Sequence, residues 1–168
     1  EGRQEIIRPL GVSRTDVFFD EAFLSEARLR VRKAVPRMQD KKVMLYAPTF
    51  RGRVSKALGP DRLDVEAFRE AFGDEWVLLV KHHPFVKERP AIPTGCASFA
   101  FDVSDSVMIE DALIAADVCI SDYSSLVFEY SLFERPMVFF AYDKEEYAAA
   151  VHMQFHSHNR LIQVSSDR

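Results

Sequence analysis

This sequence has few cysteines and no long apolar segment, and both shortages narrow the class of protein. Its two cysteines, Cys96 and Cys119, form no disulfide framework, so a reducing, cytoplasmic setting is expected. Cys119 lies in an apolar run and is expected to be a buried, small hydrophobic residue. No apolar run is long enough to span a bilayer. Residues 1–5 are mostly charged, unlike a signal peptide, and are typical of the interior of a longer protein.

Several signatures of enzymes and binding proteins are also missing. The sequence has no Walker loop, no G-x-G-x-x-G and no G-x-S-x-G pattern, the usual markers of kinases, NAD enzymes and α/β-hydrolases. Its formal net charge of −4 argues against a nucleic-acid partner. His152 and His156 have helical spacing, but no glutamate follows His152, so the zinc-protease motif is absent. We therefore expect no metal and no cofactor.

The sequence does contain apolar runs that alternate with helical patterns. The runs do not alternate between apolar and polar residues, which favours strands covered on both faces, as in a parallel sheet. They are Val43–Ala47, Trp76–Val80, Ser98–Val103, Val118–Ser121 and Met137–Ala141. The helical patterns are Glu21–Val35, Asp64–Phe72, Ser106–Ala115, Ser124–Phe133 and Asp143–Ala150. This alternation predicts an α/β fold with a Rossmann-like, doubly wound parallel sheet.

The chain divides into three segments on this interpretation. Residues 1–40 form a lead-in, with an extended Ile6-Ile7 stretch, a loop from Gly11 to Arg14 and the first helix. Residues 41–147 form the ligand-binding domain, and residues 148–168 form a polar, irregular tail.

The loops that follow the strands predict where a ligand would bind. For the common strand order 3-2-1-4-5, ligands bind at the carboxyl ends of strands one and four, where the order reverses. The loops after these strands begin Pro48-Thr49-Phe50-Arg51 and Asp122-Tyr123-Ser124-Ser125. The loop after strand two, Lys81-His82-His83-Pro84, is their neighbour. Three polar loops are therefore expected to converge on one crevice.

Side chains in these loops suit a phosphate. Ser124 and Ser125 open a predicted helix, whose unpaired amides and dipole attract anions, although a plain N-cap would look the same. Thr49 and Arg51 can bind a phosphate too, the arginine with a planar, two-pronged contact, unless both lie in a solvated loop.

His83 is the candidate catalytic residue. Pro84 restricts its backbone to extended conformations, and an imidazole fixed there can donate to a phosphate or act as an acid. The alternative is a purely structural histidine. Lys81 can add positive charge, whereas His82 is expected to point away because neighbours on a strand face opposite sides.

Five segments, taken in order, carry a family pattern. They are Gly11-Val12-Ser13-Arg14-Thr15-Asp16, Leu45-Tyr46-Ala47-Pro48-Thr49-Phe50-Arg51, Lys81-His82-His83-Pro84, the stretch from Asp117 to Ser125, and Arg135 to Phe140 followed by Tyr142-Asp143. Together they resemble the CDP-glycerol glycerophosphotransferases of teichoic acid synthesis, from about Pro9 to Tyr147.

This resemblance implies a GT-B fold, of which the chain is the C-terminal, donor-binding half. The implied activity is transfer of glycerol phosphate (ribitol phosphate in relatives) from CDP-glycerol to a teichoic acid polymer or its lipid-linked primer, at the cytoplasmic face of the membrane as a peripheral protein. The resemblance also implies that His83, Ser124 and Ser125 contact the donor pyrophosphate. Thr49 and Arg51 would line the same pocket and Asp122 would orient the turn.

Two features separate the chain from a complete member of that family. The N-terminal domain, which would supply the acceptor side, is not expected among these residues, and the segment after Tyr147 does not match the pattern. Two other functions therefore stay open: a non-catalytic nucleotide-binding fragment, and a GT-B glycosyltransferase that uses a nucleotide sugar.

Overall fold

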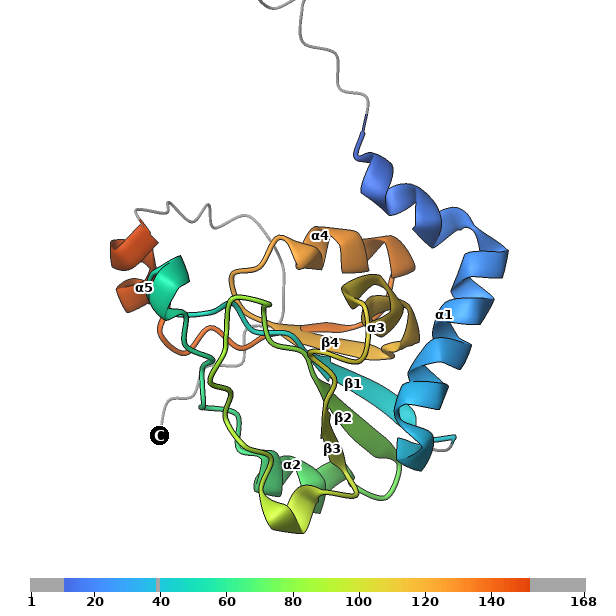
Figure 1. Cartoon of the computed structure of the whole chain (residues 1–168), viewed down its shortest axis with the longest axis horizontal. Coiled ribbons are helices and arrows are strands. Elements are labelled where there is room, and N and C mark those ends of the chain that lie inside the picture. Colours follow the sequence, from blue (N-terminus) through green and yellow to red (C-terminus); the bar gives the residue numbers. More distant parts are fainter. Residues whose placement is uncertain (1–10, 39, 152–168) are drawn as a thin grey trace, which may run out of the picture.

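A five-stranded parallel sheet forms the centre of the protein (Figure 1). The computed structural model describes residues 11–38 and 40–151. The strands are β1 (Lys42–Tyr46), β2 (Trp76–Val80), β3 (Ala100–Asp102), β4 (Val118–Ser121) and β5 (Met137–Phe139), in the order β3-β2-β1-β4-β5. The predicted doubly wound sheet and its strand order are therefore confirmed.

The helices also follow the prediction, with differences at their ends. They are α1 (Glu21–Ala34), α2 (Val65–Phe72), α3 (Ile109–Ala115), α4 (Leu126–Tyr130) and α5 (Lys144–Val151), with short 3-10 helices at Ser13–Phe19, Pro36–Met38, Val54–Lys56, Thr94–Cys96 and Ser131–Phe133. Asp20 and Asp64 cap α1 and α2 by accepting backbone N–H bonds. The expected loop from Gly11 to Arg14 is wrong in part, because a 3-10 helix begins at Ser13.

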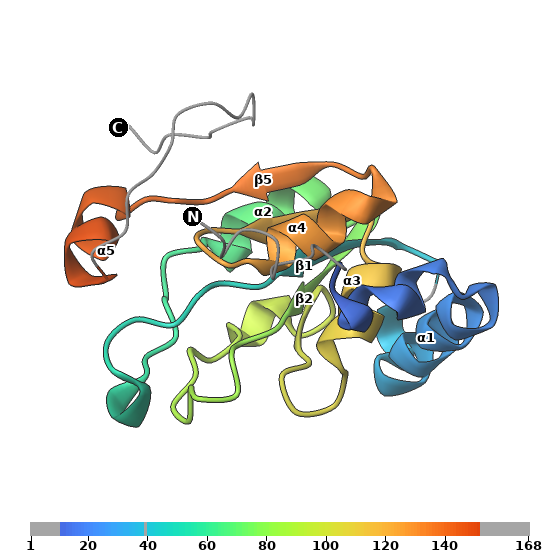
Figure 2. The ribbon, with the colours of Figure 1, turned by 90° about the horizontal axis from the view of Figure 1, so that it is seen from above.

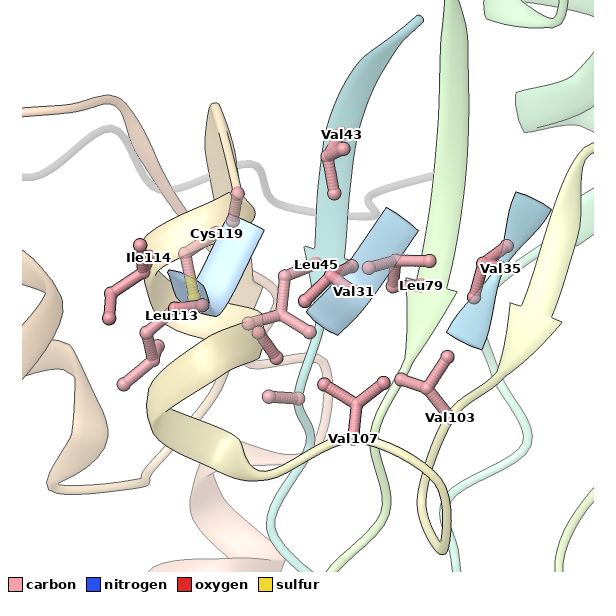
Figure 3. Close-up of a cluster of buried hydrophobic side chains, with 14 of the residues drawn as sticks. Val31, Val35, Val43, Leu45, Leu79, Val103, Val107, Leu113, Ile114 and Cys119 are labelled. Carbon is pink, nitrogen blue, oxygen red and sulfur yellow. The ribbon is translucent and has the colours of Figure 1, made fainter. Parts of the chain in front are cut away.

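Two apolar layers cover the sheet, one on each face. On one face, Val43, Leu45 and Leu79 pack beneath α1 and α3, as Figure 3 shows for Val31, Leu113 and neighbouring side chains. On the other face, Met44, Tyr46, Leu78 and Val80 pack against Val65 and Phe68 of α2. Successive strand residues thus alternate between two buried faces, which is why the runs read as continuously apolar. Cys119 is buried in the first layer, as expected.

The crossovers bring loops that are distant in sequence to one edge of the sheet. Strand β1 pairs in parallel with both β2 and β4, so β2 and β3 lie on one side of β1, and β4 and β5 lie on the other. The loops after these three strands therefore start side by side. Figures 1 and 2 place α5 at the end of the domain opposite α1. The Ile6-Ile7 stretch and His152, His156 and His158 lie outside the described residues.

Candidate functional site

A pocket of about 600 Å³ opens where β1, β2 and β4 end. Its wall contains Thr49 from the loop after β1, Lys81 and His83 from the loop after β2, and Ser124 and Ser125 from the loop after β4. The structure therefore brings together five of the seven site residues that were predicted from the sequence. Arg51 and Asp122 are not among the residues that form this wall.

Thr49, which lines the pocket, has an unused polar atom. Its backbone N–H donates to Asp122 Oδ1 at 2.8 Å, which fixes the loop after β1. Its side-chain Oγ1 is buried, and within the described part of the chain nothing hydrogen-bonds to it. A buried hydroxyl without a partner costs free energy, so a ligand that bonds to Thr49 Oγ1 would recover that cost.

Arg51 lies behind the wall, not in it, so the expectation that it lines the pocket with Thr49 is not met. Its guanidinium donates to Asp143 through Nε at 2.6 Å and through Nη2 at 2.9 Å. Nη2 also donates to Asp122 Oδ2 at 2.8 Å, and Nη1 donates to the Thr49 carbonyl at 2.6 Å. These bonds and the two carboxylates raise the pKa of Arg51 against the opposing effect of burial.

Asp122 joins two of the loops that border the pocket. Besides the ion pair with Arg51, its Oδ1 accepts the backbone N–H groups of Thr49 and Tyr123 at 2.8 and 2.7 Å. The carboxylate is nearly inaccessible to solvent, with a side-chain exposure of 3%. This arrangement agrees with the expected role of Asp122 in orienting the turn that carries Ser124.

The turn itself differs from the predicted helix start. Helix α4 begins at Leu126 and has 5 residues, and Ser125 makes no side-chain cap. The Ser124 hydroxyl accepts the Leu126 N–H at 3.4 Å, a long contact. Because so short a helix has little macrodipole, any anion here depends on the hydroxyls and local N–H groups, not on the dipole that the sequence suggested.

His83 presents a neutral imidazole to the pocket. Its Nδ1 accepts the Phe85 backbone N–H at 3.2 Å, so the ring proton belongs on Nε2. Partial burial lowers the pKa of His83, which also favours the neutral ring. The ring stacks at a tilt on Phe50 and Phe85, with centroids 5.1 and 4.4 Å away. His83 can therefore donate from Nε2 to an acceptor on a ligand.

Lys81 and His82 complete this side of the pocket. Lys81 Nζ donates to the Ser104 carbonyl at 2.8 Å, and burial lowers its pKa. His82 also borders the pocket, but its ring is almost fully buried beside Gly59, which does not line the pocket, so the ring points away as expected. A Cβ built on Gly59 would lie 3.0 Å from His82 Nδ1, so a larger residue there would require the His82 ring or its surroundings to shift.

The pocket also carries charges that sequence reasoning missed. Arg14 donates to Glu110 Oε1 at 3.1 Å and to Glu129 Oε2 at 3.0 Å, and all three line the pocket. Arg14 belongs to the first segment of the family pattern, which was the one available signal. The pocket therefore combines hydroxyls, Lys81 and His83 with a pair of glutamates that are both ion-paired with Arg14.

Across residues 11–38 and 40–151, no group of three or more His, Cys, Asp or Glu side chains is placed to hold a metal ion. In the same residues, no helix is both long and apolar enough to cross a bilayer.

Comparison with known proteins gives one consistent result. A model of the family described as CDP-glycerol:poly(glycerophosphate) glycerophosphotransferase matches residues 2–159. The teichoic acid ribitol-phosphate polymerase TarK of Staphylococcus aureus is 43% identical over 148 residues, which are 86% of this chain and 29% of TarK. The teichoic acid poly(glycerol phosphate) polymerase of Staphylococcus epidermidis is 34% identical over 148 residues, 86% of this chain and 20% of that protein.

Solved structures agree with the sequence relatives. The wall teichoic acid polymerase TagF aligns with a TM-score of 0.74 and 28% identity, over 96% of this chain and 40% of TagF. A TagF variant studied with CDPG aligns with a TM-score of 0.75 and 29% identity, over the same shares. The chain thus spans less than half the length of the relatives that it matches.

Proposed function

The chain belongs to the CDP-glycerol:poly(glycerophosphate) glycerophosphotransferase family, and we propose that it is the donor-binding half of a GT-B enzyme that transfers a polyol phosphate during teichoic acid synthesis. The donor would be CDP-glycerol or its ribitol counterpart, and the acceptor a teichoic acid chain or its lipid-linked primer. The observation that carries this proposal is that one pocket gathers Thr49, Lys81, His83 and Ser124 at the switch point of the sheet.

The side chains that line the pocket support one placement of the pyrophosphate. A pyrophosphate carries negative charge, which the Glu110 and Glu129 carboxylates would repel, so we place it against Thr49, Lys81 and His83. The neutral, hydroxyl-bearing parts of the donor would lie toward the glutamates. Thr49 Oγ1, which lacks a partner among the described residues, would then donate to a phosphate oxygen.

The proposed chemistry is a displacement at the β-phosphorus. An acceptor hydroxyl oxygen forms a bond to that phosphorus and loses its proton to solvent, the bond from phosphorus to the bridging oxygen breaks, and CMP leaves with the bonding electron pair. Negative charge therefore grows on the leaving phosphate. His83 Nε2–H and the Ser124 hydroxyl would donate to these oxygens and stabilise the charge as it develops. His83 is the residue that we assign to catalysis.

The polyol is a matter for direct measurement, because the relatives include both classes. Ribitol-phosphate polymerases reach 43% identity, and a poly(glycerol phosphate) polymerase reaches 34%.

We propose action at the cytoplasmic face of the membrane, with the protein peripheral, because a lipid-linked primer would be presented there.

Calorimetric titration with CDP-glycerol, CDP-ribitol and a UDP-sugar tests the donor assignment. We expect a CDP-polyol to bind and the UDP-sugar to bind more weakly.

Replacing His83 or Ser124 by alanine should weaken binding of the CDP-polyol by about 1–3 kcal/mol, the scale of a charge-assisted hydrogen bond. Ser131→Ala is the matched control, because the Ser131 hydroxyl donates to the Phe128 carbonyl at 2.6 Å, away from the pocket wall. Preference for the UDP-sugar would instead support a glycosyltransferase.

Turnover separates a transferase from a fragment that only binds donor. The chain is mixed with the preferred CDP-polyol and a lipid-linked acceptor, and CMP release is measured. Binding without CMP release would mean that these residues bind donor but do not transfer the polyol phosphate alone.

A further inference from the structure

We propose that Arg51 and Asp143 are positioning residues, which hold the two loops that border the pocket and do not contact the donor themselves. Asp143 follows β5 and immediately precedes α5, so the proposal makes this end of the domain part of the site. The consequence for a ligand rests on the proposed function, whereas the positioning itself is a property of the protein without ligand.

The first argument is that the Arg51 guanidinium is already engaged. Its Nε and Nη2 make a bidentate contact with Asp143, at 2.6 and 2.9 Å, and Nη2 and Nη1 reach Asp122 and the Thr49 carbonyl. All three guanidinium nitrogens therefore already donate, in four hydrogen bonds of 2.6, 2.6, 2.8 and 2.9 Å. A phosphate could bind Arg51 only by displacing a carboxylate from the guanidinium. This exchange is unfavourable because the negatively charged phosphate would then lie beside the displaced, negatively charged carboxylate.

The second argument is the path of hydrogen bonds from Asp143 to the pocket. Arg51 connects Asp143 to Asp122. Asp122 in turn accepts the N–H groups of Thr49 and Tyr123, the residues that lead into the two pocket loops. Removal of the Asp143 charge should therefore loosen Arg51 first, then Asp122, and finally both loops.

The third argument is an aromatic enclosure around Arg51. The guanidinium lies 5.2 Å from the Tyr123 ring, 4.9 Å from the Tyr147 ring and 5.7 Å from the Tyr142 ring. Tyr123 and Tyr147 are stacked, with centroids 4.1 Å apart, and the Tyr123 hydroxyl donates to Asp143 Oδ1 at 3.0 Å. These rings limit the access of water to the ion pair, and they join α5 to the turn that carries Ser124.

Two variants and a matched control test this inference. Asp143→Asn keeps the shape and removes the charge, and Arg51→Lys keeps the charge and removes the fork. Arg30→Lys is the control, because Arg30 makes an equally short bidentate contact with Asp111, at 2.8 and 2.7 Å, between α1 and α3, and neither residue lines the pocket.

The first measurement is hydrogen exchange of the protein without ligand. We expect amide exchange in peptides that cover Thr49 and Tyr123 to be about tenfold faster in Asp143→Asn and Arg51→Lys, as expected for a loss near 1.4 kcal/mol in local stability. In Arg30→Lys these peptides should exchange as in the wild type. Unchanged exchange in the first two variants would overturn the proposal, whatever the protein binds.

The second measurement is CDP-glycerol and CDP-ribitol affinity, and its sign distinguishes the two roles of Arg51. If Arg51 only positions the loops, Asp143→Asn should weaken binding about tenfold. If Arg51 is a phosphate ligand, the same variant frees its guanidinium, and tighter or unchanged binding would refute the positioning role. A wild-type protein that binds neither donor would refute the proposed function, and the exchange experiment would still decide the inference.

Discussion

Substitution of Asp122 by asparagine should destabilise the protein clearly, because this carboxylate is buried and makes three hydrogen bonds. The asparagine side-chain oxygen can still accept the N–H groups of Thr49 and Tyr123, so those two bonds are weakened, not lost. The amide nitrogen, however, would face Arg51 Nη2, which now bonds to Oδ2 at 2.8 Å, and two donors cannot pair. Arg51 keeps Asp143 as a partner, which limits the loss.

The expected cost follows from these contacts. Losing one hydrogen bond between charged groups costs about 1.5–3 kcal/mol, and breaking a buried ion pair by removing one partner costs about 3–5 kcal/mol. Because Asp143 still compensates the Arg51 charge, we expect about 3 kcal/mol for Asp122→Asn.

Urea unfolding followed by far-ultraviolet circular dichroism measures this cost. Asp105→Asn is the control, because Asp105 pairs with Arg89 at 2.6 Å but its side chain is 81% exposed, so solvent screening should leave a much smaller change. An equal free energy of unfolding for Asp122→Asn and Asp105→Asn would refute the view that the Asp122 network supports the pocket.

Three further predictions follow from other groups. Burial lowers the pKa of His82 and of His83 below the ordinary 6.5, so the unfolded chain binds more protons than the folded protein near and below that pH. The free energy of unfolding should therefore fall as the pH is lowered from 7.5 to 5.5. Urea unfolding at both pH values should show this loss, and His82→Gln should reduce it. Cys96 and Cys119 are buried and burial raises the pKa of Cys119 to about 12, so a thiol reagent should label neither cysteine until urea unfolds the protein, and rapid labelling of the folded protein would contradict this burial. Tyr130→Phe should cost only about 1 kcal/mol of unfolding free energy, because the Ala116 carbonyl that accepts from Tyr130 keeps its bond from Arg135; a much larger cost would mean that the phenol has another role.

The strand positions were predictable because each buried strand reads as an apolar run between polar loops. Trp76–Val80 and Val118–Ser121 were predicted with their observed bounds, and the strand order followed from the commonest doubly wound topology. The helix bounds were less accurate. The pattern from Ser124 to Phe133 predicts one helix, but the structure divides it into α4 and a 3-10 helix, because hydrogen bonding at each end depends on local contacts that periodicity does not report.

The pocket residues were predictable as a set because parallel strands deliver their following loops to one edge. The roles within the set were harder to predict. A sequence shows that an arginine follows β1, but it does not show that Asp143, 92 residues later, occupies its fork. The same limit applies to Arg14, whose partner Glu129 is 115 residues away. Both pairs depend on tertiary contacts that a single sequence does not contain.

His82 shows that strand alternation can hold beyond a strand's last residue. The prediction that His82 faces away extends the alternation of β2 beyond Val80, its last residue. The ladder continues past Val80, because the Lys81 N–H donates to the Tyr46 carbonyl at 2.9 Å, and the His82 N–H then donates to the Ser104 hydroxyl at 2.9 Å. The His82 ring is buried beside Gly59, which does not line the pocket, whereas His83 is exposed on the wall. Alternation therefore remains informative where the residues after a strand still hydrogen-bond as its extension.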